Sequence, residues 1–320
     1  MSQQTIWGRR NPKIEGSHWE QLDLSSYKMT KPIVICLSGN ATINEREANG
    51  FCKTAENLMG LKLSSDNQEE IYEYADLIGV SYSNREGSET GRLTNEDIES
   101  LVTNILMPLC VDESGQRLPL EQVCKNVSAV TFFSFCHGAI ETFNICREFN
   151  VKLIKELGFN GEETDIILQS MMEISYSPRT VSNLIPRVSA YSARDTKNAV
   201  FLQEFDFNNQ DIVLQSIHQN VKQRVFFDGI DIYASRLSDF SRDEHGVNII
   251  RRDEDWQSMD KSKNADCVSQ MMGYALARSV ANSINNFNSD TYIPKIPMEQ
   301  LLGELKDIQQ SFENDNEREI

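Results

Sequence analysis

The clearest pattern along the chain is an alternation between short, continuously apolar runs and longer stretches with one apolar face. The apolar runs over residues 32–39, 76–83 and 127–135 have the length and the β-branched or aromatic content of buried strands. Continuous apolarity, rather than strict alternation with polar residues, favours strands of a parallel sheet that is covered on both faces.

Helices are predicted between these strands. Residues 45–59 place their apolar side chains on one stripe, and Gly60 is expected to end the helix. Residues 94–107 form a second helix, for which Thr94 and Asp97 make a capping signature. The third strand passes directly into another helix.

The pattern continues after the third strand, where it predicts further helices, short strands and one long helix over residues 265–285. In chain order these are helices over 137–157 and 161–171, a short strand or extended loop over 173–177, a strand over 186–192, a helix over 211–222, strands over 224–227 and 230–234, and a helix over 265–285.

Repeated strand–helix–strand units predict an α/β fold with a mostly parallel sheet sandwiched by helices. We expect residues 1–30 to be an exposed N-terminal lead-in and residues 31–285 to form the domain, with a candidate lid insertion around residues 195–225. Residues 286–320 are expected to form a C-terminal helix and an acidic tail.

Composition narrows the function classes. A net charge of −17 argues against a general nucleic-acid binder, and no apolar run approaches the ~20 residues of a membrane span. The seven cysteines are scattered without a CxxC pair, which favours free thiols in a reducing compartment. We therefore expect a cytoplasmic protein, or one secreted into the reducing cytosol of a host cell.

The most informative residues are Ser134-Phe135-Cys136-His137-Gly138, where an apolar strand meets the start of a helix. This segment resembles the nucleophile elbow of the α/β-hydrolase superfamily, a three-layer fold in which the motif is usually G-x-S-x-G. The positions two before and two after the nucleophile must be small, so that strand and helix can approach. Ser134 and Gly138 meet that demand, and the positive end of the helix dipole would favour a thiolate at Cys136.

The resemblance also implies an oxyanion hole. One donor would be the backbone N–H of His137, the residue after the nucleophile. The second would come from the loop after an earlier strand, where Asn40 and Ala41 are the candidates. The chain departs from the superfamily in having cysteine for serine, as dienelactone-hydrolase-like members do, and Ser134 for the first glycine. Both changes argue against ordinary lipase or esterase activity.

A cysteine nucleophile needs a base, and in the superfamily the order is nucleophile, acid, histidine. His245, in a polar loop before the last long helix, holds the place of the histidine, and Asp195, after a strand, that of the acid. Asp228 and Asp231 compete with Asp195 because they also lie at strand edges. The predicted set of Cys136, Asp195 and His245 would transfer an acyl group through a covalent intermediate.

The three other histidines are weaker candidates. His18 lies in the lead-in, His137 is expected to point away from its neighbour Cys136, and His218 lies mid-helix. We expect no metal site, because the acidic clusters at 69–70 and 253–255 have no histidine at ligand spacing. No cofactor is expected either, since no glycine-rich nucleotide motif is present.

Three functions are compatible with these patterns. The first is a cysteine-dependent hydrolase or acyltransferase acting on an ester or thioester of a small-molecule or acylated substrate. The second is a papain-like cysteine peptidase or transglutaminase, which the strand leading directly into Cys136 disfavours. The third is a non-enzymatic scaffold that binds a host or partner protein, since the acidic tail resembles the export signals of bacterial type IV secretion effectors.

Overall fold

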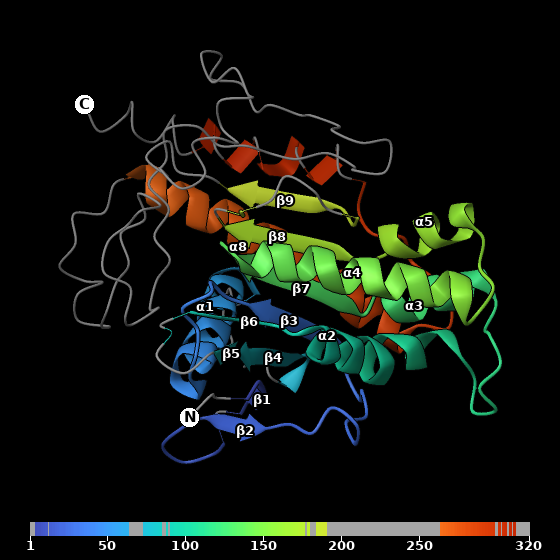
Figure 1. The fold of residues 1–320 in the computed structure, drawn as a ribbon. Coiled ribbons are helices and arrows are strands. Elements are labelled where there is room, and N and C mark those ends of the chain that lie inside the picture. The colour runs from blue at the N-terminus through green and yellow to red at the C-terminus, as the bar shows by residue number, and fades with distance from the viewer. Residues whose placement is uncertain are drawn as a thin grey trace.

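A seven-stranded mixed sheet forms the centre of the protein (Figure 1). The computed structural model describes residues 4–11, 13–63, 73–84, 88, 90–176, 178–179, 184–190, 263–297 and 300–311, apart from 302, 306 and 309. The strand order is β2-β1-β4-β3-β7-β8-β9, and the five strands from β4 to β9 run parallel. Their bounds are β3 (Ile33–Leu37), β4 (Asp76–Ser81), β7 (Val130–Phe135), β8 (Met172–Tyr176) and β9 (Arg187–Ala190).

The predicted α/β class with a mostly parallel sheet is confirmed, and the three apolar runs are its three central strands. β3 lies between β4 and β7, although β4 follows it in the chain and β7 comes later. The strand order therefore reverses direction at β3, and the carboxyl ends of β3 and β7 lie side by side. In open α/β sheets this reversal point is where ligands bind.

The N-terminal segment differs from the predicted lead-in. β1 (Ile6–Arg10) pairs antiparallel with β4, and β2 (Trp19–Gln21) pairs antiparallel with β1. Trp7 and Trp19 are buried, so the segment covers one edge of the parallel sheet instead of standing exposed. The two strands have only five and three residues and contain charged side chains, so the sequence shows no run of apolar residues there.

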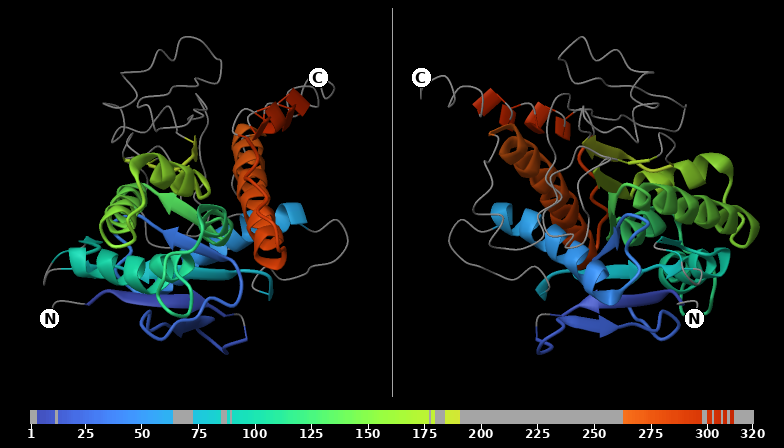
Figure 2. Two further views of the ribbon diagram at one scale, coloured as in Figure 1. Left: turned by 90° about the vertical axis from the view of Figure 1, so that its right-hand side faces the viewer. Right: turned by 60° about the vertical axis from the view of Figure 1, so that its left-hand side comes forward.

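Helices lie on both faces of the sheet (Figure 2). An apolar cluster is buried between the helices and the sheet on each face. On one face, α1 (Glu45–Leu63) packs against α8 (Lys263–Asn288), and Leu301 and Leu305 of the C-terminal segment are buried in the same cluster. Gly273 allows the close approach of the two helices, because a Cβ there would lie 2.5 Å from the carbonyl oxygen of Leu58. The C-terminal segment is thus docked on the domain where the structure describes it.

The other face is covered by the helices between β4 and β8. These are α2 (Asn95–Leu101), a π-helical turn (Val102–Leu106), a 3-10 turn (Met107–Cys110), α3 (Leu120–Val127), α4 (Gly138–Lys155) and α5 (Gly161–Gln169). A small hairpin of β5 (Ser83–Asn84) and β6 (Gly91–Arg92) stands apart from the main sheet. No helix among the described residues has the length and apolarity required to cross a bilayer.

Helix boundaries follow the predicted signals only in part. The predicted capping box is confirmed, since the N–H of Asp97 donates to Thr94 Oγ1 and that of Thr94 donates to Asp97 Oδ2. By contrast, α1 continues through Gly60 to Leu63. Packing of α1 on the sheet and α8 outweighs the roughly 1 kcal/mol cost of an internal glycine.

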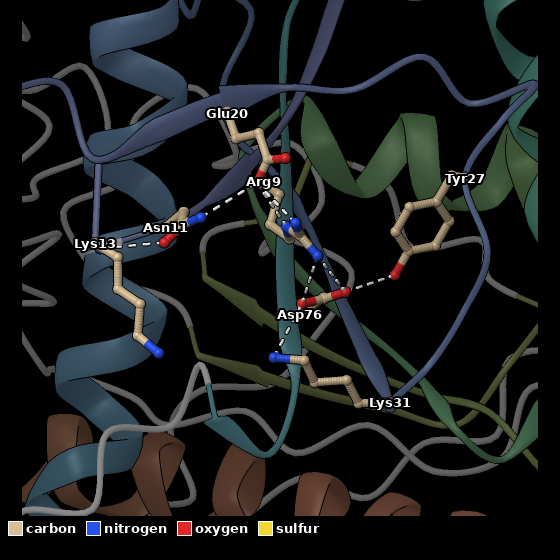
Figure 3. A network of polar contacts seen from close by, with 7 residues as sticks. All are labelled: Arg9, Asn11, Lys13, Glu20, Tyr27, Lys31 and Asp76. Atoms are coloured by element: carbon tan, nitrogen blue, oxygen red, sulfur yellow. Dashed lines mark hydrogen bonds and ion pairs between the residues drawn. The ribbon is translucent and has the colours of Figure 1, made fainter. Parts of the chain in front are cut away.

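A polar network ties the N-terminal strands to the start of β4 (Figure 3). Asp76, which is buried, accepts hydrogen bonds from Tyr27 Oη at 2.8 Å and from Arg9 Nη1 at 3.3 Å, and Lys31 Nζ lies 3.4 Å away. Arg9 also pairs with Glu20 of β2 at 2.7 Å. Burial and the neighbouring carboxylate of Asp76 raise the pKa of Tyr27, so this phenol stays a donor.

We expect Asp76→Asn to lower the free energy of unfolding by about 2 kcal/mol, because one amide oxygen cannot balance the two cations. Urea unfolding followed by tryptophan fluorescence measures the change. Asp23→Asn is the control, since Asp23 is fully exposed and bonds only to its neighbours Ser25 and Ser26. Equal midpoints for Asp76→Asn and the wild type would contradict a structural role for the network.

Candidate active site

The sharp turn at Cys136 joins β7, a fully buried strand, to the helix that follows it. β7 ends at Phe135 and α4 begins at Gly138, so only Cys136 and His137 form the turn. Cys136 has a φ of 54°, in the left-handed region that costs a residue with a side chain about 1–2 kcal/mol. Such strain persists where surrounding contacts impose it, and it is concentrated at functional sites. The predicted strand, turn and helix are therefore present, whereas catalysis by Cys136 stays a prediction.

Two backbone hydrogen bonds hold this turn. The N–H of Cys136 donates to the carbonyl oxygen of Tyr176 at 3.0 Å, and the N–H of Arg179 donates to the carbonyl oxygen of Cys136 at 3.0 Å. Both partners belong to the end of β8 or the residues just after it. The side chain of Cys136 is buried in the cluster that contains α1 and α8.

Gly138 lets the helix start lie directly on β3. A Cβ at this position would lie 1.8 Å from the carbonyl oxygen of Leu37 and 2.8 Å from that of Ser38. No side chain can be accommodated at such distances from backbone atoms. The small residue predicted two positions after Cys136 thus has a direct steric cause.

Ser134 is small, as the motif requires, and it also takes part in a buried polar network. Its hydroxyl donates to Glu173 Oε1 at 2.5 Å and lies 2.7 Å from Ser175 Oγ. Glu173 Oε2 accepts from Arg187 Nε at 2.6 Å, and both charged side chains are fully buried. Arg187 Nη2 in turn donates to the carbonyl oxygen of Ala139 in the first turn of α4, at 3.5 Å.

The candidate oxyanion-hole donors lie just after two adjacent strands, β3 and β7. β3 pairs with β7, so the loop that contains Asn40 and Ala41 follows the strand next to the Cys136 turn. Within the described residues, no acceptor is bonded to the backbone N–H of Asn40, Ala41 or His137. The N–H of Gly91 donates to the carbonyl oxygen of Asn40 at 2.6 Å, which fixes the loop against β6. These three donors stay predictions for the oxyanion hole.

Tyr82 lies between this loop and the turn. Its hydroxyl donates to the carbonyl oxygen of Ser38 at 2.8 Å, and the side chain is fully buried. Burial, followed by the nearby side chains of Glu141 and Cys136, raises the pKa of Tyr82. The phenol is therefore a neutral donor that holds the end of β3 in place beside Cys136.

The imidazole of His137 contacts Glu141, a residue of the helix α4 that begins just after it. Its Nε2 lies 3.0 Å from Oε1 of Glu141, one helical turn on, and the same oxygen accepts from the N–H of Leu93 at 3.3 Å. Glu141 is buried, whereas His137 is about one-fifth exposed. The expected orientation of His137 away from its neighbour agrees with this pairing.

The other two members of the predicted triad, Asp195 and His245, lie outside the described residues, as do Asp228, Asp231 and His218. The candidate lid around residues 195–225 and the acidic tail from residue 312 also lie outside them. The structure therefore describes Cys136 and its surroundings, and its role as nucleophile stays a prediction, as do the proposed base and acid.

The remaining described cysteines differ from Cys136 in backbone geometry. Of the six whose side chains are described, all free thiols, Cys136 alone has a positive φ. Burial raises the pKa values of Cys36, Cys110, Cys124 and Cys146, with that of Cys110 reaching about 12. These four thiols are therefore poor nucleophiles at neutral pH. Within the described part of the chain, no cluster of His, Cys, Asp or Glu side chains is suited to a metal.

Sequence reasoning missed the polar residues that surround the turn. Glu141 lies four residues after His137, a spacing that places both on one helix face and was readable. Glu173 and Arg187 were also readable as charges within predicted strands, where a charge is rarely tolerated without a partner. Tyr82 gave no signal, because a tyrosine at the end of a strand is ordinary.

No protein-family description matches the chain, and the search of curated proteins likewise finds no match.

Proposed function

We propose that this protein is a cysteine-dependent hydrolase or acyltransferase that acts on an ester or thioester bond through Cys136. The observation that carries the proposal is the left-handed φ of Cys136 on a two-residue turn between a buried parallel strand and a helix. This conformation is costly and presents one side chain at the carboxyl edge of the sheet. A purely structural cysteine would gain nothing from it.

The mechanism would proceed in two steps. The thiolate of Cys136 attacks the carbonyl carbon, and the N–H groups of His137 and of Asn40 or Ala41 stabilise the negative oxygen that forms. The leaving group departs with a proton from the base, which leaves an acyl group on the sulfur. Water or another acceptor, deprotonated by the same base, then takes the acyl group and releases the thiol.

His245 is the proposed base and Asp195 the proposed acid that orients it, with Asp228 and Asp231 as alternatives to Asp195. Their support is their order in the chain after Cys136. The α/β-hydrolase-like three-layer arrangement is part of the same proposal. Helices on both faces of the sheet, and a turn located where the strand order reverses, support it.

The parallel strand that leads directly into Cys136 favours this reading over a papain-like peptidase or a transglutaminase. A small-molecule or acylated substrate fits a thiol at the edge of an α/β sheet. A location in the cytoplasm, or in the reducing cytosol of a host, would keep Cys136 reduced.

The test is to trap the acyl-enzyme. The full chain is mixed at neutral pH with p-nitrophenyl acetate or an acyl thioester, quenched in acid, and digested for mass spectrometry. We expect acetylation at Cys136, with release of p-nitrophenol in a burst equal to the enzyme concentration. Cys136→Ala should abolish both signals, and His245→Ala should slow acylation by at least about 100-fold, the usual scale of general-base catalysis.

Cys146→Ala is the matched control, because Cys146 is a buried thiol on α4 whose pKa burial raises. That variant should keep the burst. Acylation spread evenly over the cysteines, or a burst that survives in Cys136→Ala, would refute the proposal and favour the non-enzymatic scaffold. A burst that is lost in Cys136→Ala but unchanged in His245→Ala would refute only the assignment of the base.

A further inference from the structure

We infer that Ser134, Glu173 and Arg187 form a positioning device for Cys136, which we call the elbow clamp. The inference rests on the proposed function, because it assigns these residues to the geometry of the proposed nucleophile. None of the three contacts a reacting atom, so each is a positioning residue rather than a catalytic one.

The clamp connects the strand before the turn to the helix after it through a series of side-chain hydrogen bonds. On the strand side, Ser134 Oγ donates to Glu173 Oε1 at 2.5 Å. Glu173 Oε2 accepts from Arg187 Nε at 2.6 Å, and Arg187 Nη2 donates to the carbonyl oxygen of Ala139 at 3.5 Å, on the helix side. The path therefore begins two residues before Cys136 and ends three residues after it.

The register of the sheet places the clamp residues together. Ser134 of β7 is the neighbour of Ser175 of β8, while Glu173 of β8 is the neighbour of Arg187 of β9. Glu173 and Ser175 point to the same face because side chains alternate along a strand. That face is the one covered by α4, which begins at the turn. One polar cluster thus links three strands to the helix that follows Cys136.

Stability alone does not account for an ion pair in this position. Glu173 and Arg187 are both fully buried, and desolvation of two charges commonly cancels their attraction. Apolar side chains of similar volume often serve a core equally well. The ion pair instead contributes defined geometry, because its hydrogen bonds fix Ser134 and Ala139 at set positions relative to each other.

This defined geometry is needed because the backbone of the turn is strained at Cys136. A residue with φ of 54° relaxes unless its neighbours over-determine the conformation. The backbone bonds to Tyr176 and Arg179 hold Cys136 itself, and the clamp holds the residues on either side of it. Relaxation of the turn would change the position of the sulfur relative to the start of α4, whose dipole favours a thiolate.

The test compares Ser134→Ala with Ser175→Ala by the rate at which iodoacetamide alkylates Cys136 between pH 5 and 10. Ser134→Ala cuts the clamp and leaves the ion pair in place, whereas Ser175→Ala removes a buried hydroxyl from the same cluster outside the path. Thermal melts confirm that each variant is folded. No substrate is needed, so the readout is independent of the activity.

We expect Ser134→Ala to slow alkylation of Cys136 at pH 7 by about tenfold, and to move the midpoint of the pH profile upward by about one unit. Ser175→Ala should stay within about twofold of the wild type. Glu173→Gln, which keeps an acceptor but loses the charge, should give an intermediate rate. Equal rates for Ser134→Ala and Ser175→Ala, with both folded, would overturn the clamp. A wild-type Cys136 that reacts no faster than Cys146 would instead refute the proposed function.

Discussion

Gly138→Ala is expected to be among the most destabilising single substitutions in this chain, lowering the free energy of unfolding by about 4 kcal/mol or more. The added Cβ would meet the carbonyl oxygen of Leu37 at 1.8 Å and that of Ser38 at 2.8 Å. Because both obstacles are backbone atoms, one at the end of β3 and one just after it, no side-chain rotation relieves the clash. The start of α4 must move away from the sheet, or β3 must bend. Urea or thermal unfolding measures the loss.

The control is Gly161→Ala, which places the same methyl group at the first residue of another helix, α5. There a Cβ would meet nothing within 4 Å. Alanine has the higher helix propensity, so this variant should match the wild type or exceed its stability by up to about 1 kcal/mol. Similar stabilities for the two alanine variants would show that the turn is looser than the structure describes, and would weaken the steric basis of the proposed site.

The second large effect is expected at Arg187. Arg187→Met should cost about 3–5 kcal/mol, because it leaves the carboxylate of Glu173 buried with only hydroxyl partners. Glu173→Met combined with Arg187→Met removes both charges and should recover most of that loss. The comparison is made by chemical unfolding of the two single variants and the double variant.

Arg278→Met is the matched control, because Arg278 pairs with Glu304 at 3.2 Å on the surface, where both side chains are accessible to solvent. Exposed ion pairs contribute about 0–1 kcal/mol, so little change is expected. A double variant less stable than either single variant would contradict the treatment of Glu173 and Arg187 as one coupled unit. The double variant also distinguishes a loss of stability from a loss of positioning at Cys136. It should regain stability, whereas the rate at which its Cys136 is alkylated should stay low.

The sheet was largely predictable because its central strands are continuously apolar and its helices have clear stripes. Residues 33–37 and 130–135 are short runs rich in β-branched or aromatic residues, a pattern typical of buried strands. Even the turn at Cys136 was readable, since a strand, a small residue and a helix start coincide there. Local pattern sufficed wherever burial on both faces left few alternatives.

The parts that escaped prediction depend on contacts between distant segments. The strand at residues 6–10 is short and carries two arginines, and its pairing with β4 and β2, together with the ion pairs of Arg9, makes it a strand. The helix α1 passes Gly60 because α8, some 200 residues later in the chain, packs on it. The elbow clamp likewise joins residues from three strands, which no window of sequence brings together.

The order of the elements along the chain has a consequence for biosynthesis. β3, β7 and β8, together with the helices on the α4 side, precede residue 190, whereas α8 and the segment with Leu301 and Leu305 follow residue 262. A chain emerging from the ribosome can therefore assemble the sheet while the apolar face behind Cys136 still lacks α8. Cys136 therefore acquires its enclosed surroundings only after α8 has been synthesised.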